Sequence, residues 1–115
     1  MAHFYTYETV EIPLVFEPEG ILEDYRHIVV SLRQNSTGTQ IDKSENELGI
    51  DVENNTISIY LTQEETAKFV GGDEQNPSYA QIQVNIYYEN TERDVSGVKS
   101  IKVYNNLYKK VITDE

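Results

Sequence analysis

Hydrophobic and polar residues alternate with a period of two over two segments in the middle of the chain, residues 56–61 and 79–88. The inward-facing members of the two segments are Ile57, Ile59, Leu61, Ala80, Ile82, Val84, Ile86 and Tyr88. A period of two is typical of a strand that is buried on one face and wet on the other. We therefore predict that these two strands form the centre of the core.

The segment between these strands predicts a short helix. Thr62 and Glu65 have the spacing of a capping box, in which each side chain accepts from the backbone amide of the other. Gly71 and Gly72 are expected to end the helix. Ala67, Phe69 and Val70 are then expected to close one end of the core.

Further strands are predicted on both sides of this centre. They cover about residues 9–16, 25–34, 39–43 and 99–104, with a minor edge strand at Ile50 and Val52 and a candidate strand over 105–112. Pro13 cannot donate a ladder hydrogen bond, so residues 9–16 are expected at a sheet edge. Short strands spaced by roughly 8 to 12 residues predict an all-β, immunoglobulin-like antiparallel sandwich, with the helical turn in the crossover between strands E and F. Residues 8–112 would form this domain, with an N-terminal arm over 1–7 and a C-terminal tail over 113–115.

Composition narrows the classes of function. The 115 residues carry 9 basic and 20 acidic side chains, a net charge of −11, which opposes binding to nucleic acid or to anionic membranes. The acidity is explained by solubility alone, or by docking on a basic partner surface. No cysteine is present, which excludes disulfides, thiolate metal sites and a cysteine nucleophile. The first residues lack the pattern of a signal peptide, and no apolar run approaches the roughly 18 residues of a membrane span.

The sequence contains few candidate residues for catalysis or for ligand binding. His3 and His27 are not paired by any motif, and the acidic residues of 42–53 lack the ligand spacing and glycine of a calcium loop. Asp73 and Glu74 follow a glycine pair that is not a phosphate loop, and no nucleophile elbow occurs. We therefore expect no catalytic residue, no cofactor and no metal, and we expect that the protein is not an enzyme.

One surface pattern is informative. The outward residues of segment 79–88 form a polar and aromatic stripe, with Lys102 and Tyr104 expected beside it: Tyr79, Gln81, Gln83, Asn85 and Tyr87. Tyrosines and amides suit a protein interface, tyrosine also stacks on sugar rings, and an ordinary wet sheet face has the same pattern. Tyr79 is in addition a candidate for the tyrosine corner of an immunoglobulin fold.

A resemblance extends this interpretation. The run LTQEETAKFVGG, followed by YAQIQVNIYYENTERDVSGVKSIKV, resembles a family of small proteins from phage and prophage structural-gene cassettes of Gram-positive bacteria, over about residues 10–112. It is more distantly similar to the immunoglobulin-like N-terminal domain of phage baseplate upper proteins. The shared residues support the fold and carry no ligand or catalytic role.

The resemblance implies a virion structural or accessory protein at the tail, baseplate or capsid surface. Such a protein would be made in the bacterial host cytoplasm and assembled with other virion proteins. It would be present in several copies or as a homo-oligomer, without nucleic acid or membrane contact. The alternative is a carbohydrate-binding β-sandwich module for attachment to the host surface.

Overall fold

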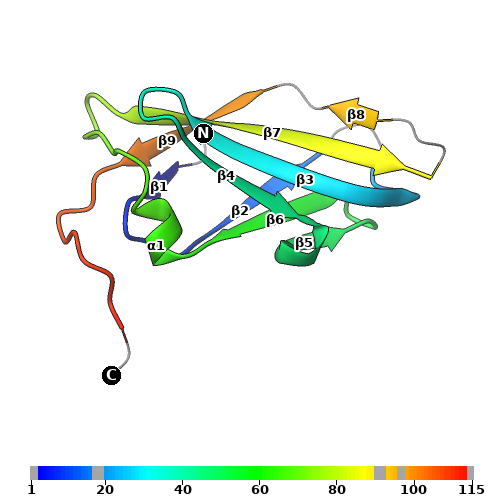
Figure 1. Cartoon of the computed structure of the whole chain (residues 1–115), viewed down its shortest axis with the longest axis horizontal. Coiled ribbons are helices and arrows are strands. Elements are labelled where there is room, and N and C mark those ends of the chain that lie inside the picture. The colour runs from blue at the N-terminus through cyan, green and yellow to red at the C-terminus, as the bar shows by residue number, and fades with distance from the viewer. Residues whose placement is uncertain (1–2, 17–19, 90–92, 96–97, 114–115) are drawn as a thin grey trace.

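Two packed β-sheets make up the protein in the computed structural model, which describes residues 3–16, 20–89, 93–95 and 98–113 (Figure 1). The strands of the larger sheet are, in spatial order, β1 (His3–Tyr5), β9 (Lys99–Tyr104), β7 (Ser78–Tyr88), β3 (Tyr25–Gln34) and β4 (Thr39–Ser44), and β8 (Arg93–Val95) also pairs with β7. The strands of the smaller sheet are β2 (Val10–Val15), β6 (Thr56–Leu61) and β5 (Leu48–Asp51). The helical elements are a 3₁₀ turn, η1 (Glu45–Glu47), and α1 (Gln63–Thr66).

The strand order is that of an immunoglobulin domain of variable type. Strands β2, β6 and β5 take the places of B, E and D, and β9, β7, β3 and β4 take those of G, F, C and C′. The predicted immunoglobulin-like sandwich is therefore confirmed, and α1 lies in the E–F crossover as predicted. Residues 10–15 form strand B of this order and not its first strand.

The first strand lies within the range that the sequence assigned to an arm, so that prediction is wrong for residues 3–7. Strand β1 pairs in parallel with β9, with Phe4 opposite Val103. The Phe4 side chain is 0% exposed, and the amide of Thr6 donates to the carbonyl of Tyr104 at 2.9 Å. A three-residue strand is too short to show a period, and Met1 and Ala2 lie outside the described residues.

The predicted core is confirmed. The inward residues of β6, and those of β7 from Ala80 to Ile86, are buried together with Ile28, Val30 and Leu32 of β3. Tyr88 is only partly buried against this core, and Phe69 closes one end of it, 3% exposed. Ile12 of β2 is buried opposite Ile59, and β2 and β5 are the edges of the smaller sheet, as Pro13 and the weak pattern near Ile50 predict. With no cysteine or tryptophan in the chain, aliphatic side chains fill the sites that a disulfide and a tryptophan occupy in antibody domains.

The capping box at the start of α1 is also confirmed. The amide of Glu65 donates to the Thr62 hydroxyl at 3.2 Å, and the amide of Thr62 donates to the Glu65 carboxylate at 3.0 Å. Partial burial raises the pKa of Glu65, but the Lys43 ammonium, at 2.6 Å, and the bond from Thr62 outweigh it and hold the pKa below its usual value. These contacts fasten α1 to β4.

Thr62→Ala is expected to lower the free energy of unfolding by about 1 kcal/mol, because the amide of Glu65 loses its acceptor. Urea denaturation measures the change. Thr9→Ala, at an exposed position outside any helix, is the matched control and should change stability by less than about 0.5 kcal/mol. Equal stabilities for the two variants would contradict the capping role.

The glycine pair has a different role from the predicted one. Helix α1 ends at Thr66, before the glycines, and Val70 is exposed rather than part of the plug. Gly72 instead pairs with β9: its amide donates to Val103 at 2.9 Å, and its carbonyl accepts from Asn105 at 2.7 Å. A Cβ atom on Gly71 would lie 2.5 Å from the amide nitrogen of Asn105, so these glycines permit close contact between backbones.

Residues 105–112 do not form the further strand that the sequence suggested. After β9 the chain continues without strand pairing toward the C-terminus (Figure 1). It is bonded to the domain at Asn106, whose amide donates to the Thr6 hydroxyl at 3.1 Å, and at Ile112, whose backbone bonds to the Gln63 side chain. Leu107 is 99% exposed, and its neighbours Tyr108 and Ile112 are 57% and 67% exposed. Of the predicted tail, Asp114 and Glu115 lie outside the described residues.

Candidate protein-interaction surface

The predicted stripe lies on the outer face of the larger sheet, along β7. Its alternating residues are exposed or half-buried, and their inward neighbours are buried. We call this set the outer sheet face: Tyr79, Gln81, Gln83, Asn85 and Tyr87. Tyr79 lies opposite Lys102 of β9, and Gln83 lies opposite Ser31 of β3, so neighbouring strands extend the face on both sides.

Arg93 orders one end of the outer sheet face. Its guanidinium donates to the Asn85 side-chain oxygen at 2.9 and 2.6 Å and to the Tyr87 hydroxyl at 2.9 Å. The same group lies 5.1 Å from the centre of the Tyr87 ring, a cation–π distance. Sequence reasoning did not include Arg93 in this surface, because β8 has only three residues and shows no period. One side chain thus holds an amide and a phenol in fixed positions.

A polar network fills the area beside β7. Asn35 donates to the Gln81 side-chain oxygen at 3.0 Å, and Asp42 accepts from Ser31 at 2.6 Å and from Gln40 at 3.0 Å. Neighbouring side chains therefore satisfy one another before any partner arrives. This leaves an ordered surface in which the residues of the outer sheet face are themselves uncharged.

Tyr104 does not join the stripe, so the predicted grouping is wrong for this residue. The register pairs Ser78 with Val103, which places Tyr104 on the same side of the sheet but beyond the end of β7. There it packs with His3 and Tyr5 of β1, with ring centres 5.4 and 5.5 Å away. No local pattern predicted this cluster, because β1 itself was not predicted.

The tyrosine-corner role predicted for Tyr79 is wrong. Its side chain is 49% exposed on the outer sheet face. Tyr88, at the far end of β7, instead donates its hydroxyl to the backbone carbonyl of Ile21 at 2.6 Å. This bond fastens the end of β7 to the chain that precedes β3.

His27 and several of the acidic residues considered as possible ligands form hydrogen bonds with their neighbours. His27 lies 2.8 Å from a carboxylate oxygen of Glu45, and this hydrogen bond, with that from the amide of Ile28, lowers the pKa of Glu45. The side chain and amide of Asn54 lower the pKa of Asp51 in the same way. Within residues 3–16, 20–89, 93–95 and 98–113, no group of three or more His, Cys, Asp or Glu side chains is placed to hold a metal ion.

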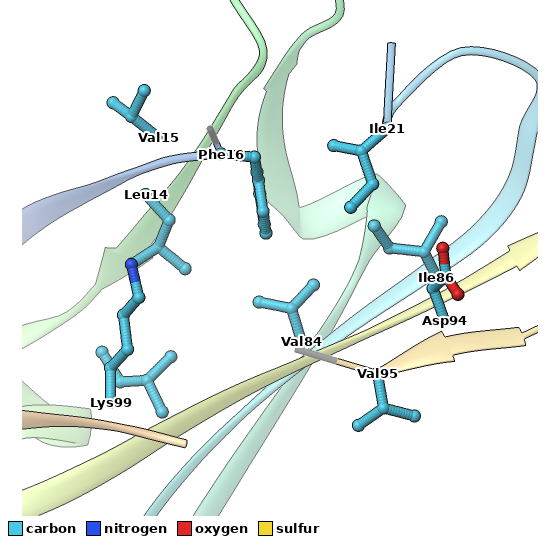
Figure 2. Close-up of a pocket in the computed structure, with 10 residues that line it drawn as sticks. Leu14, Val15, Phe16, Ile21, Val84, Ile86, Asp94, Val95 and Lys99 are labelled. Atoms are coloured by element: carbon cyan, nitrogen blue, oxygen red, sulfur yellow. The ribbon is translucent and has the colours of Figure 1, made fainter. Parts of the chain in front are cut away.

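A second surface feature is a cavity of about 380 Å³ between the sheets, which we call the apolar groove (Figure 2). Leu14, Phe16 and Ile21 form one wall, and Val84 and Ile86 of β7 form the floor. Its two charged lining residues, Asp94 and Lys99, lie on opposite sides of the groove (Figure 2).

The topology explains why the groove exists. Strands β8 and β9 pair with different parts of β7, with Asp94 opposite Ile86 and Lys99 opposite Ile82. Strand β1 lies on β9 rather than beside β2, so it does not cover the end of β2 that carries Leu14. The floor residues are nevertheless buried, so the groove is narrow at its base.

Comparisons with known proteins add little. In the described part of the chain, no helix has the length and apolar character that crossing a membrane requires. No family model and no curated protein matches the sequence. Among solved structures, one described as murine CRIg is similar over 91% of each chain, with a TM-score of 0.43 and 11% identical residues. A similarity at this level carries no argument, so the immunoglobulin-like assignment follows from the strand order.

Proposed function

We propose that the protein is a structural or accessory component of a phage particle and acts by protein–protein contact rather than by catalysis. The resemblance of residues 10–112 to phage structural-cassette proteins supports the phage assignment. The observation that carries the contact function is the ordered outer sheet face, in which Arg93 holds Asn85 and Tyr87.

The physical argument concerns the entropy of binding. Side chains that are ordered before association lose little freedom when a partner covers them. Tyrosines add large apolar area together with a hydroxyl, and they are enriched at the centres of interfaces. The outer sheet face combines both properties, since Tyr87 is fixed by Arg93 while Tyr79 is half exposed.

Charge indicates the kind of partner. With 20 acidic and 9 basic side chains, the protein is attracted to basic protein surfaces and repelled by polyanions. Proteins of the tail, baseplate or capsid surface are the partners that the resemblance implies. Contacts between exposed charges are screened over about 8 Å at physiological ionic strength, so added salt should weaken association.

Particle incorporation tests the proposal. Tyr79→Ala and Tyr87→Ala should each weaken binding by roughly 1–2 kcal/mol per interface, which reduces incorporation at limiting protein about tenfold. Tyr60→Ala is the matched control, because Tyr60 is a tyrosine 48% exposed on a strand of the other sheet. Quantitative mass spectrometry of purified particles gives the copy number, and thermal melting of the free domains verifies folding.

Normal incorporation of the Tyr79→Ala/Tyr87→Ala double variant would contradict a contact role for the outer sheet face. Absence of the wild-type chain from the particles would contradict the phage assignment. Binding of the wild-type chain to a defined glycan, lost in the same double variant, would favour the carbohydrate-binding alternative.

A further inference from the structure

An exposed apolar segment follows β9. Residues 105–113, here called the C-terminal segment, contain Leu107, Tyr108 and Ile112, all largely exposed and close in sequence. Isolated exposed apolar residues are common, but several in one extended segment are typical of a surface that a partner covers. The segment also carries Lys109 and Lys110 in an otherwise acidic protein.

An unoccupied position for a strand lies beside β2. Among the described strands, β2 pairs with β6 alone, and an immunoglobulin sandwich has room for strand A on its other side. The amide of Phe16 donates to the carbonyl of Asn55 on the β6 side of β2. In an antiparallel pair, alternate residues direct their N–H and C=O groups to opposite sides of the strand, so those of Pro13 and Val15 face the open edge. Pro13 has no amide hydrogen, so this edge has one hydrogen-bond donor fewer. Its carbonyl oxygens can still accept hydrogen bonds from an added strand.

We infer that the C-terminal segment of one copy of the protein binds in the apolar groove of a second copy, beside β2. The inference rests on the proposed function, since it names a second copy as one of the partners in assembly. In an extended segment every second side chain faces the groove. Both possible faces present two apolar side chains on either side of a lysine. One face consists of Leu107, Lys109 and Val111, and the other of Tyr108, Lys110 and Ile112.

Charges at the Asp94 end of the groove favour this occupant. Four of the nine basic residues lie between Lys99 and Lys110, so the C-terminal part of the chain is basic while the rest is acidic. At the groove, Asp94 would attract a lysine of the incoming segment, and Lys99 would repel it. The lysine stems can pack along the apolar walls while their ammonium groups remain in water.

The geometry favours another copy over the chain's own groove. The C-terminal segment begins after Tyr104, whereas the groove lies at the other end of β9, at Lys99. In its own chain the segment is tied to α1, because the Gln63 side chain donates to the Ile112 carbonyl at 2.9 Å and accepts from its amide at 2.8 Å. The contact between copies joins one surface to a different one, so it produces either a reciprocal dimer or an assembly of rings or rows.

Cross-linking in a protein without cysteine tests the contact directly. Full-length chains carrying Val15→Cys are mixed with chains carrying Leu107→Cys or Tyr108→Cys, which sample the two alternating faces of the segment. We expect a disulfide-linked pair of different chains from at least one mixture under mild oxidation. Val52→Cys, in the exposed turn after β5, replaces Val15→Cys as the matched control and should give none.

Sedimentation equilibrium measures the strength of the contact. Either Leu107→Asp or Tyr108→Asp, whichever residue the cross-linking places against the groove, should weaken self-association at least about tenfold, since it puts a charge in an apolar groove. Both residues are exposed, at 99% and 57%, so neither change should disturb the fold. Val52→Asp should have no effect. Lys99→Glu should strengthen association, because it removes the repulsion of the incoming lysines. The double variant Lys109→Glu/Lys110→Glu should weaken it, because it removes the attraction to Asp94. Gln63→Ala should strengthen it, because the C-terminal segment is released from α1.

A wild-type chain that stays monomeric, together with cysteine variants that form no mixed disulfide, would overturn the inference. Self-association that neither Leu107→Asp nor Tyr108→Asp weakens would overturn it as well. An intramolecular disulfide in the Val15→Cys/Leu107→Cys double variant would show that the segment occupies its own groove, which also overturns it. Normal particle incorporation of a monomeric protein would leave the proposed function intact while rejecting this contact. Self-association without any incorporation would reject the proposed function while supporting the contact.

Discussion

Phe4→Ala is expected to lower the free energy of unfolding by about 3–5 kcal/mol, the usual cost of removing a fully buried phenyl ring. Phe4 is 0% exposed and its ring meets that of Phe69 edge to face, with centres 5.6 Å apart. Chemical denaturation of the two proteins measures the difference. His3→Ala, the neighbouring and exposed residue of the same strand, is the control and should cost less than about 1 kcal/mol.

The partner ring provides a second measurement of the same contact. Phe69→Ala should also cost about 3–5 kcal/mol, and the double variant should lose less than the sum by about 0.5–1.5 kcal/mol, the coupling of an aromatic pair. Deletion of residues 1–7 should accordingly unfold or strongly destabilise the domain. Stabilities of Phe4→Ala and the wild type within about 0.5 kcal/mol of each other would show that the N-terminus is an arm after all.

Gly72→Ala is expected to destabilise the domain by at least about 3 kcal/mol, because overpacking against backbone atoms is relieved only by moving strands. A Cβ atom there would collide with the carbonyl oxygen of Asn76 and lie 2.7 Å from the amide nitrogen of Ser78. Both atoms belong to the backbone that leads into β7. The midpoint of urea denaturation reports the loss.

Gly49→Ala is the matched control for this substitution. Its new Cβ atom would meet the hydroxyl of Tyr60, at 2.7 Å, which is the far end of a side chain that can rotate away. We expect a cost below about 1 kcal/mol for this variant. If Gly72→Ala lowered the free energy of unfolding no more than Gly49→Ala does, the close contact of Gly72 with the backbone of β9 and of the residues before β7 would be wrong.

The parts of the fold that were predicted correctly have strong local signals. The alternation in β6 and β7 and the apolar pattern of β3 each extend over six or more residues, so the buried face could be assigned. The capping box of Thr62 and Glu65 is a local motif, and it is present in the structure. Pro13 at an edge follows from its missing donor.

The parts that were missed depend on contacts between distant residues. Strands β1 and β8 have three residues each, too few for a period, and β1 exists because it pairs with β9 at the other end of the chain. The glycine pair was interpreted as a helix end, whereas the contact of Gly72 with Val103 determines its role. A single sequence carries no local signal for such pairings.

The candidate surface was likewise predicted only in part. The residues from Tyr79 to Tyr87 share a face because one strand places them there, which the sequence predicts. Arg93 was not predicted to join the surface, and the neighbours of Tyr104 were not foreseen, because both positions depend on which strands pair and in which register. The apolar groove arises because none of the described strands other than β6 pairs with β2, which only the topology reveals.

The most direct measurement of the central claim, that the protein acts by contact within a phage particle, is a cryo-EM map of the particle produced by the genome that encodes it. We predict several symmetry-related copies of the domain, each with Tyr79 and Tyr87 covered by a neighbouring protein. Particles that lack the domain, or domains whose outer sheet face is open to solvent in every copy, would contradict the claim.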